Sequence, residues 1–425
     1  MKNFQYLFFA LIILVAGCRK DEIKTDFEFE PTTGGETVKT RLSGQVIDEA
    51  GLPISDAIVS LRRIEKITNE DGVFSFENMD LRKDGQMITI EKSGFFTNIK
   101  RVTPTQNTSF QKVGLITKGA PTGAFTSSNG GTISKPTGEK ITFIANGIVD
   151  VSGSEYNGEV SVYTHHFNPE NPYFGETMPG DLRGISDVGN PVQLETYSMI
   201  LVELYGESGQ KLNLKEGTTA MVEFPIKGSA AANAPVEIPL WSLDEATGIW
   251  VKEGVAVREG NYYKGEVSHF SFWNCDDFFD LVTLEGLVLD HNGFPLVNTT
   301  VSLEIINGGS VSSGTTNSGG FFRGGVPANE EMILTVINQC GEPGHKQNVG
   351  PFNTDQQITI TTDNSSDFLT ISGSLIDCNN DAVTQGYVVV ESDFGIKNIL
   401  PVDGNGDFNS SIIVCQTNEL SLIHI

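Results

Sequence analysis

The chain has few positive charges. Its 425 residues carry 28 Lys and Arg against 54 Asp and Glu, which gives a net charge of −26 and an isoelectric point near 4.5. Because nucleic-acid binding requires clustered Lys and Arg to neutralise phosphates, this balance argues against a nucleic-acid partner. It suits a soluble surface on which like charges repel one another.

The common catalytic motifs are also missing. None of the six histidines has a Glu three residues further on, as zinc carboxypeptidases require, and there is no His-Glu-x-x-His, Gly-x-Ser-x-Gly, phosphate-binding loop or Cys-x-x-Cys. Adjacent acids such as Asp276 and Asp277 occur, but in an acidic β-protein such pairs are usually solvated. We therefore predict that the chain is not an enzyme and that it binds no cofactor or metal.

Long helical stretches of Ala, Glu, Lys and Leu are absent. Short runs of Val, Ile, Thr and Phe recur instead, interrupted by Gly, Asn and Asp, which is typical of all-β proteins. A length of 425 residues allows roughly three domains of about 150 residues each. The predicted fold class is all-β, with tandem β-sandwich modules.

Cysteine is scarce, with five residues in total. Cys18 stands apart near the N-terminus. In an exported chain the other four allow one or two disulfides, with three connectivities if all of them pair, and free buried thiols are an equal alternative. These four residues are Cys275, Cys340, Cys378 and Cys415.

The N-terminal residues have the pattern of an export signal. Lys2 precedes an apolar run from Leu7 to Ala16, which is too short to span a bilayer. The following Val15-Ala16-Gly17-Cys18 resembles the bacterial lipobox. This resemblance implies removal of residues 1–17 and lipidation of Cys18, so that acyl chains anchor the protein to a membrane. An ordinary secretory signal with an incidental cysteine is the alternative.

Three residues close behind Cys18 carry a second resemblance. Lys20, Asp21 and Glu22 resemble the surface-export signal of Bacteroidetes lipoproteins, which implies exposure at the outer membrane. We expect residues 18–37, which are polar and contain Gly and Pro, to be a flexible tether.

One sequence pattern occurs three times, starting at Ser43, Glu285 and Ser372. The pattern predicts a strand, a turn capped by an Asp with Gly or Asn at a position of positive φ, and a second strand with alternating apolar residues. The copies align without a gap at Gly44, Gly286 and Gly373, at Asp48, Asp290 and Asp377, at Gly51, Gly293 and Asn380, and at Val59, Val301 and Val388.

A Gly two residues before a Phe is the second shared feature, which predicts a tight hairpin followed by a strand with a core aromatic. The pairs are Gly72 and Phe74, Gly320 and Phe322, and Gly406 and Phe408. Together these residues resemble the carboxypeptidase-regulatory-like module, a transthyretin-like or immunoglobulin-like sandwich of about seven strands. The module accompanies enzymes, transporters and adhesins without chemistry of its own, so the fold does not give the function.

The resemblance predicts such modules at residues 38–117, 280–365 and 366–425. The third copy is the weakest match, since Ala382 replaces the proline of the others. It is also short, because the first copy continues for about forty residues beyond Phe74 whereas the third has seventeen after Phe408. We therefore expect a truncated third repeat. The six residues from Leu420 to Ile425 match the translation of a sequencing adapter. This match favours adapter sequence read as protein over the alternative, a genuine strand that corresponds to Ile88 to Ile90.

Residues 118–279 lack the repeat and are predicted to form a central β-rich domain, or two subdomains. Their order of strands resembles the middle region of cartilage intermediate layer proteins and some Bacteroidetes lipoproteins, and their Gly-Gly start resembles ZU5-type domains. The three tryptophans lie in this region or at its end, in alternating strands, which favours core packing over a sugar-stacking platform. They are Trp241, Trp250 and Trp273.

Two other features of the central region are candidate sites. Adjacent His165 and His166 face opposite sides of a strand and cannot share a metal. Met178, Asp181 and Arg183 lie in the longest irregular stretch, near 167–195. Because long loops in compact domains are often functional, we predict a binding surface there.

We predict a non-catalytic, lipid-anchored protein exposed at the bacterial outer membrane, with a structural or adhesive role or one in displaying a binding surface. Its expected partners are the membrane, through the lipid, and a glycan or protein ligand. One alternative is a polysaccharide-binding accessory lipoprotein. The other is the non-catalytic part of an enzyme whose catalytic domain follows residue 425.

Overall fold

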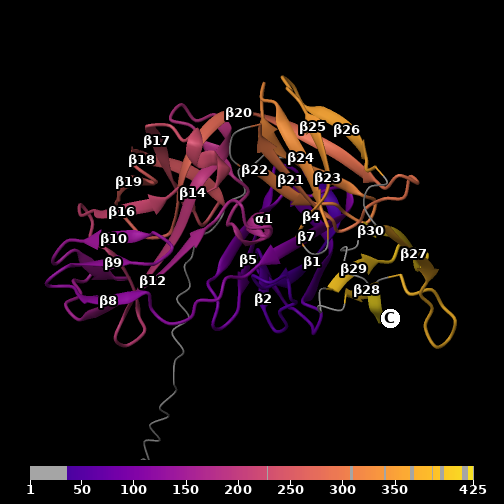
Figure 1. Ribbon diagram of the computed structural model, residues 1–425. Coiled ribbons are helices and arrows are strands. Elements are labelled where there is room, and N and C mark those ends of the chain that lie inside the picture. The colour runs from indigo at the N-terminus through magenta and orange to yellow at the C-terminus, as the bar shows by residue number, and fades with distance from the viewer. Residues whose placement is uncertain are drawn as a thin grey trace, which may run out of the picture. The chain divides into compact units, whose positions relative to one another are not determined.

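The fold of the described chain is almost entirely β. The computed structural model describes residues 36–226, 228–306, 310–338, 341–363, 368–384, 386–392, 397–413 and 420–424. In these ranges it contains thirty-one strands, the four-residue helix α1 (Phe174–Thr177) and the 3₁₀ helix η1 (Ser229–Ala232). The predicted all-β class is therefore confirmed (Figure 1).

The first repeat is a β-sandwich of seven strands. One sheet has the order β4-β1-β7 and the other β3-β2-β5-β6. Apolar side chains from both sheets, among them Val46 and Ile90, form one buried core between them. The strands are β1 (Thr37–Ile47), β2 (Ile58–Leu61), β3 (Ile64–Ile67), β4 (Val73–Arg82), β5 (Gln86–Glu91), β6 (Asn98–Val102) and β7 (Asn107–Gly114).

The second repeat has the same topology. Its sheets have the orders β23-β20-β26 and β22-β21-β24-β25, and in both repeats the central strand of the smaller sheet pairs antiparallel to one neighbour and parallel to the other. The strands are β20 (Phe272–Leu289), β21 (Thr300–Ile305), β22 (Ser310–Thr315), β23 (Phe321–Pro327), β24 (Met332–Ile337), β25 (Pro343–Val349) and β26 (Gln356–Thr361).

The third repeat has counterparts of five of these strands among its described residues. β27 pairs with β30, and β28 lies between β29 and β31. His424 lies opposite Val389 as Thr89 lies opposite Ser60 in the first repeat. This register is the one that a genuine strand would have. The adapter origin concerns the DNA and stays a prediction, which resequencing would test. The strands are β27 (Phe368–Ser374), β28 (Tyr387–Ser392), β29 (Lys397–Pro401), β30 (Asp407–Ile413) and β31 (Leu420–His424).

The turn shared by the repeats forms as the sequence predicts. Oδ1 of Asp48 accepts hydrogen bonds of 2.9 Å from the backbone N–H groups of Ala50 and Leu52. Asp290 and Asp377 make the same two bonds in their repeats. The expected positions of positive φ are confirmed, at Gly51 (82°), Gly293 (88°) and Asn380 (66°).

The shared glycine of each repeat makes room for the shared phenylalanine. Gly44 lies directly opposite Phe74 on the neighbouring strand, and a Cβ atom at Gly44 would stand 2.4 Å from Phe74 Cζ and 2.2 Å from the backbone oxygen of Gln111. Equivalent Cβ atoms would stand 2.2 Å and 2.8 Å from the ring Cζ atoms in the second and third repeats. The aromatic ring therefore fills the space above the glycine.

The central region contributes two hydrophobic cores. One contains Trp273, and the other contains Trp241 and Trp250 together with Phe96 and Ile99 from the first repeat. The region's strands are β8 (Gly123–Thr126), β9 (Gly131–Ser134), β10 (Lys140–Phe143), β11 (Ile148–Asp150), β12 (Glu159–Phe167), β13 (Arg183–Ile185), β14 (Pro191–Gly206), β15 (Lys211–Leu214), β16 (Ala220–Pro225), β17 (Glu237–Asp244), β18 (Ile249–Glu259) and β19 (Tyr262–Val267).

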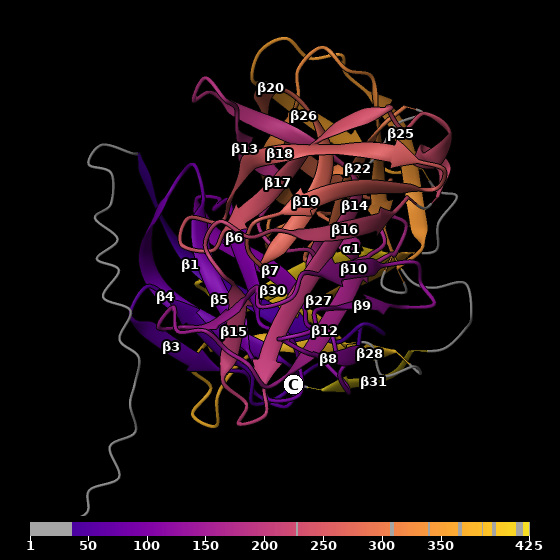
Figure 2. The same ribbon diagram turned by 90° about the vertical axis from the view of Figure 1, so that its left-hand side faces the viewer.

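Strand β20 belongs both to the central region and to the second repeat (Figure 2). Its residues 272–280 pair with β14, whereas residues from Leu281 onward pair with β23 and β26. The sequence boundary between residues 279 and 280 thus lies inside a continuous strand, where the strand changes its partners.

Candidate binding site at the junction of the repeats

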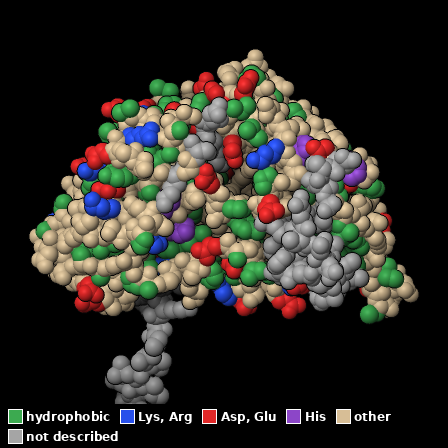
Figure 3. All heavy atoms as spheres, in the orientation of Figure 1, with side chains coloured by type: hydrophobic (Ala, Val, Ile, Leu, Met, Phe, Trp, Pro, Cys, Tyr) green, Lys and Arg blue, Asp and Glu red, His purple; other side chains and the backbone are tan. Residues whose placement is uncertain are grey.

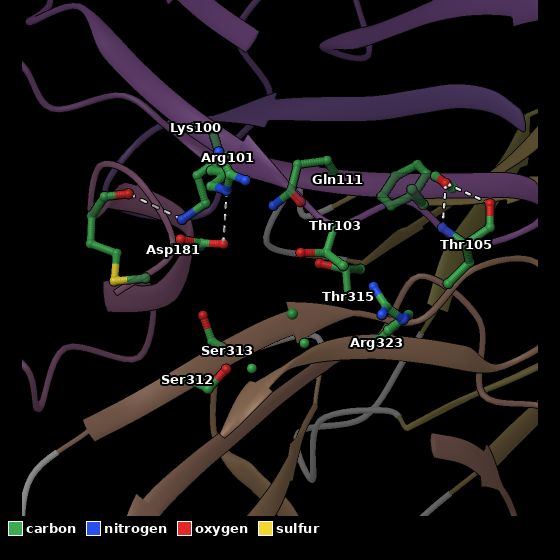
Figure 4. Close-up of a pocket in the computed structure, with 16 residues that line it drawn as sticks. Lys100, Arg101, Thr103, Thr105, Gln111, Asp181, Ser312, Ser313, Thr315 and Arg323 are labelled. Carbon is green, nitrogen blue, oxygen red and sulfur yellow. Dashed lines mark hydrogen bonds and ion pairs between the residues drawn. The ribbon is translucent and has the colours of Figure 1, made fainter. Parts of the chain in front are cut away.

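A polar cavity of about 40 Å³ lies where the first repeat, the segment after α1 and the second repeat meet (Figure 4). Its walls come from β6 and β7, from the loop at residues 178–181 and from β22 and β23. Charged and hydrogen-bonding side chains dominate the lining. They include Lys100, Arg101, Thr103, Gln111, Thr315 and Arg323.

Lys100 is a buried cation in β6. The residue is only 4% exposed. Its Nζ donates hydrogen bonds to the backbone oxygens of Met178, at 3.0 Å, and of Gly175. Burial lowers the pKa of Lys100 to about 8, although the nearby carboxylates of Glu176 and Asp181 oppose the shift. The ammonium group therefore joins β6 to the backbone around α1.

Arg101, the next residue, is buried in a different environment. Its guanidinium donates to the backbone oxygens of Thr247, at 2.9 Å, and Asp84, at 2.8 Å, and Nε lies 3.6 Å from a carboxylate oxygen of Asp181. Burial lowers the pKa of Arg101, and Asp181 opposes this shift. Arg101 thus connects the first repeat to the hairpin of β17 and β18.

Glu176 of α1 lies against the second repeat. It is 3% exposed, and its Oε1 accepts a hydrogen bond of 2.6 Å from the Thr300 hydroxyl. Within the described residues its buried Oε2 has no hydrogen-bond partner. The Asn98 amide donates to the backbone oxygens of Gly114, at 2.8 Å, and Thr177, at 3.1 Å. Three segments distant in sequence therefore meet through polar groups.

Arg323 closes the cavity from the second repeat. Its Nε lies 3.0 Å from Oε1 of Glu285, and Nη1 donates to the backbone oxygen of Lys83 at 2.7 Å. Lys100, Arg101 and Arg323 each donate two hydrogen bonds to the chain's own oxygens. The geometry consequently supports fixing the modules to one another more than holding a ligand.

The buried charge of Lys100 predicts a pH effect on stability. The unfolded side chain has a pKa near 10.5 and the folded one near 8. Between these values the unfolded state binds a proton that the folded state lacks, so the stability of the wild type should rise with pH relative to Lys100→Met, by about 3 kcal/mol in all. Urea denaturation of both proteins from pH 7 to 10.5 measures the difference.

Lys118 provides the control for that experiment. Although burial opposes it, hydrogen bonds to Glu203 and Tyr205 raise its pKa. The advantage of the wild type over Lys118→Met should therefore stay constant up to about pH 10.5 and shrink only above it, whereas the stability relative to Lys100→Met rises between about pH 8 and 10.5. A constant difference between wild type and Lys100→Met across the range would contradict the assignment of Lys100.

The predicted binding surface lies at the same junction. Met178 is 2% exposed, Asp181 faces Arg101, and Nη1 of Arg183 donates to the backbone oxygen of Asp84. The structure brings the three residues together, but the surface that they form is occupied by the chain's own first repeat. This part of the sequence is thus a contact within the chain.

The tryptophans pack in the cores, as their alternation predicts. Trp241 and Trp250 are 0% exposed and Trp273 is 1% exposed. The indole N–H of Trp241 donates to the backbone oxygen of Asp276 at 3.1 Å, and that of Trp273 to His269 at 2.9 Å. The alternative of a sugar-stacking platform is wrong for these three residues.

The histidine pair lies on β12. Burial lowers the pKa of His165 to about 3, with added repulsion from Lys135 and His166. Nε2 of His166 lies 3.2 Å from the Ser198 hydroxyl and 3.1 Å from the Pro225 backbone oxygen. Over the described part of the chain, no group of three or more His, Cys, Asp or Glu residues is arranged to hold a metal ion.

The cysteines and the N-terminal signals are described only in part. Cys275 is free and fully buried, and burial raises the pKa of its thiol; Cys378 is free and exposed. The other three cysteines and the residues of the predicted export signal lie outside the described ranges. They are Cys18, Lys20, Asp21, Glu22, Cys340 and Cys415.

The sequence of β6 contains a signal for the junction. Consecutive cations inside a strand point to opposite faces, so one cation must point inward when neighbouring strands cover the strand. Lys100 and Arg101 stand between Ile99 and Val102, and all five residues of β6 are buried. No comparable signal marks Glu176, whose partner Thr300 is distant in sequence.

Comparison with known proteins gives limited similarity. No family model matches the chain. Cartilage intermediate layer protein 1 of Sus scrofa is 29% identical over 107 residues, which are 24% of this chain and 17% of that protein. The expected resemblance to this family is confirmed for that part, and the chain matches less than a fifth of the relative's length. The resemblance to the regulatory-like module and to bacterial lipoproteins stays a prediction.

Solved structures with related features are more distant. The Bacillus anthracis TIE protein is 11% identical, with a TM-score of 0.17, over 76% of this chain and 50% of that one. BcpA, the major pilin subunit of Bacillus cereus, is 10% identical, with a TM-score of 0.16, over 77% of this chain and 100% of that one. None of the helices within the described ranges has the length and apolar character to cross a membrane.

Proposed function

We propose that this chain is a non-catalytic protein of the bacterial surface, held at the outer membrane by a lipid on Cys18, with a structural or adhesive role. The main support is that the residues shared by the repeats stabilise the fold. The Asp of each turn binds backbone N–H groups, and the Gly accommodates the Phe ring. The repeats therefore bring no shared side chain to a reaction.

The contacts between modules support the same proposal. Lys100, Arg101 and Glu176 are buried and connect the first repeat, the central region and the second repeat. Separation of the modules would break these bonds and also expose the apolar core that Phe96 shares with Trp241, so it is opposed. Modules that act as one body suit a protein that carries load or presents a surface.

The polysaccharide-binding alternative lacks such support. Sugar rings commonly stack on exposed aromatic faces, and the three tryptophans are buried. A glycan array probed with the full chain tests this alternative, because specific binding of any glycan would favour it over a purely structural role.

The anchor is tested by replacing the lipidation residue. Cys18→Ala should move the protein out of the membrane fraction of its host cell, because no acyl chain can be attached. Cys378→Ala, at an exposed free cysteine, is the matched control and should stay with the membrane. Sedimentation of Cys18→Ala with the membranes would refute the lipid anchor.

Surface exposure is tested separately. Replacing Asp21 and Glu22 by alanine should keep the protein in the membrane fraction but protect it from protease added to intact cells. Equal protease sensitivity of this variant and the wild type would show that these acids are not an export signal.

A further inference from the structure

The hairpin of the second and third strands recurs in every repeat, and its outer face is covered in two of them. In the second repeat this hairpin is β21–β22. Thr300 on it donates to Glu176, and the side chain of Ser313 lies so close to Gly175 that a Cβ atom there would stand 2.6 Å from Ser313 Cβ. The segment around α1 thus covers this face.

In the third repeat the hairpin is β28–β29, and the first repeat covers its outer face. One buried cluster joins the two repeats and is completed by an ion pair of 2.6 Å between Lys397 and Asp71. The Tyr387 hydroxyl also donates to Asp71 at 3.2 Å. The apolar members of the cluster are Tyr387, Val389 and Ile399 from the third repeat and Val73 and Phe110 from the first.

The first repeat leaves the same face open. Ile58 and Ile67 lie directly opposite each other on β2 and β3, as Tyr387 and Pro401 do on β28 and β29. Ile58 is 38% exposed and Ile67 is 66% exposed. We call this pair the isoleucine patch. Ile58 occupies the position of Tyr387, which docks in the third repeat, whereas the positions of Val389 and Ile399 hold Ser60 and Glu65.

The second repeat leaves open the surface that receives such a face. Phe321 follows Gly320 as Val73 follows Gly72. Phe321 and Val73 are therefore equivalent positions. Val73 is covered by the third repeat, whereas Phe321 is 50% exposed and lies opposite the partly exposed Leu287. Phe321 and Leu287 form what we call the phenylalanine patch.

The charges also favour a contact between copies. The hairpin of β2 and β3 exposes Arg62, Arg63 and Lys66 against a single acid, Glu65, in a chain whose net charge is −26. Acidic side chains are spread over the face seen in Figure 3. A cationic hairpin is attracted to the overall negative charge of a second copy of this acidic molecule.

We propose that the isoleucine patch of one copy docks on the phenylalanine patch of a second copy, so that Ile58 and Phe321 take between chains the places that Tyr387 and Val73 have in the cluster within a chain. The two patches differ, so each contact is head-to-tail and leaves one patch free at each end. Such contacts extend into a row or close into a ring. This inference does not depend on the proposed anchor or on any ligand.

Sedimentation velocity of the full chain in detergent, over a wide concentration range, tests the proposal. The wild type should associate reversibly. Ile67→Lys and Phe321→Lys should each weaken the association by about tenfold or more, because the contact would bury an unpaired ammonium group. Val188→Lys, at a position 80% exposed and outside both patches, is the control and should associate like the wild type.

Mixing the two variants gives the sharper test. Ile67→Lys keeps a sound phenylalanine patch and Phe321→Lys a sound isoleucine patch, so an equal mixture should form pairs that neither variant forms alone and that do not grow further. Circular dichroism verifies that both variants are folded, and Ile58→Lys and Leu287→Lys replace any that is not. A wild type that stays monomeric, or a mixture that forms no pairs, would overturn the proposal.

Discussion

Replacing Trp241 with alanine should lower the free energy of unfolding by about 3–5 kcal/mol, as is usual for a large aromatic residue removed from a core. Trp241 is fully buried and packs in one core with residues of the first repeat. Its indole N–H also bonds to the backbone oxygen of Asp276. The change therefore leaves a cavity and removes a hydrogen bond at the same place. Calorimetric unfolding measures the loss.

Phe278 supplies the matched control. Its ring lies 5.7 Å from that of Trp241 in a T-shaped contact, but it is 37% exposed. Phe278→Ala should therefore cost only about 1 kcal/mol, since it removes an aromatic contact and little buried area. Equal losses for the two variants would show that Trp241 does not have the packing role assigned here.

A valine in place of Gly44 should destabilise the first repeat by about 3 kcal/mol, at the upper end of the usual cost of overpacking. Its Cβ would stand 2.2 Å from the backbone oxygen of Gln111 and 2.4 Å from Phe74. Because the first of these atoms belongs to the backbone of β7, shortening the ring with Phe74→Leu should not restore stability. Calorimetry of the single and double variants measures both effects.

Gly314 on β22 is the control for this substitution. A Cβ atom there would meet no other atom within 4 Å, and valine favours strands. Gly314→Val should therefore be neutral or slightly stabilising. A loss at Gly314 equal to that at Gly44 would mean that the close contact with β7 and Phe74 is not the cause.

The parts of the fold that the sequence predicts are local. Asp48 and its counterparts act on N–H groups two and four residues away, so their role follows from a short stretch of chain. The same holds for the positive φ at Gly51. Comparing the three copies strengthened these predictions, because coincidence at one position does not recur at the same place three times.

The junction was not predictable in the same way. Glu176 and Thr300 are joined by a hydrogen bond although 124 residues separate them, and nothing near either residue indicates the other. The sequence marks Met178, Asp181 and Arg183 because they lie in a stretch predicted to be long and irregular. The structure instead places α1, β13 and the start of β14 in this stretch, with Arg183 on β13, and the stretch contacts the first repeat through Arg101 and Asp84. A stretch predicted to be irregular can thus be an internal contact as well as an exposed one.

Strand β20 has a consequence for any attempt to divide this chain. Its first half completes a sheet of the central region and its second half the small sheet of the second repeat. A variant that ended at Phe279 would keep nearly all of the pairing with β14 but lose the whole second repeat, and a fragment that began at Asp280 would carry the central strand of the β23-β20-β26 sheet without its continuation along β14. A protease would find no linker to cleave between the two modules. Because the two modules share a continuous strand, we expect the second repeat and the central region to unfold together.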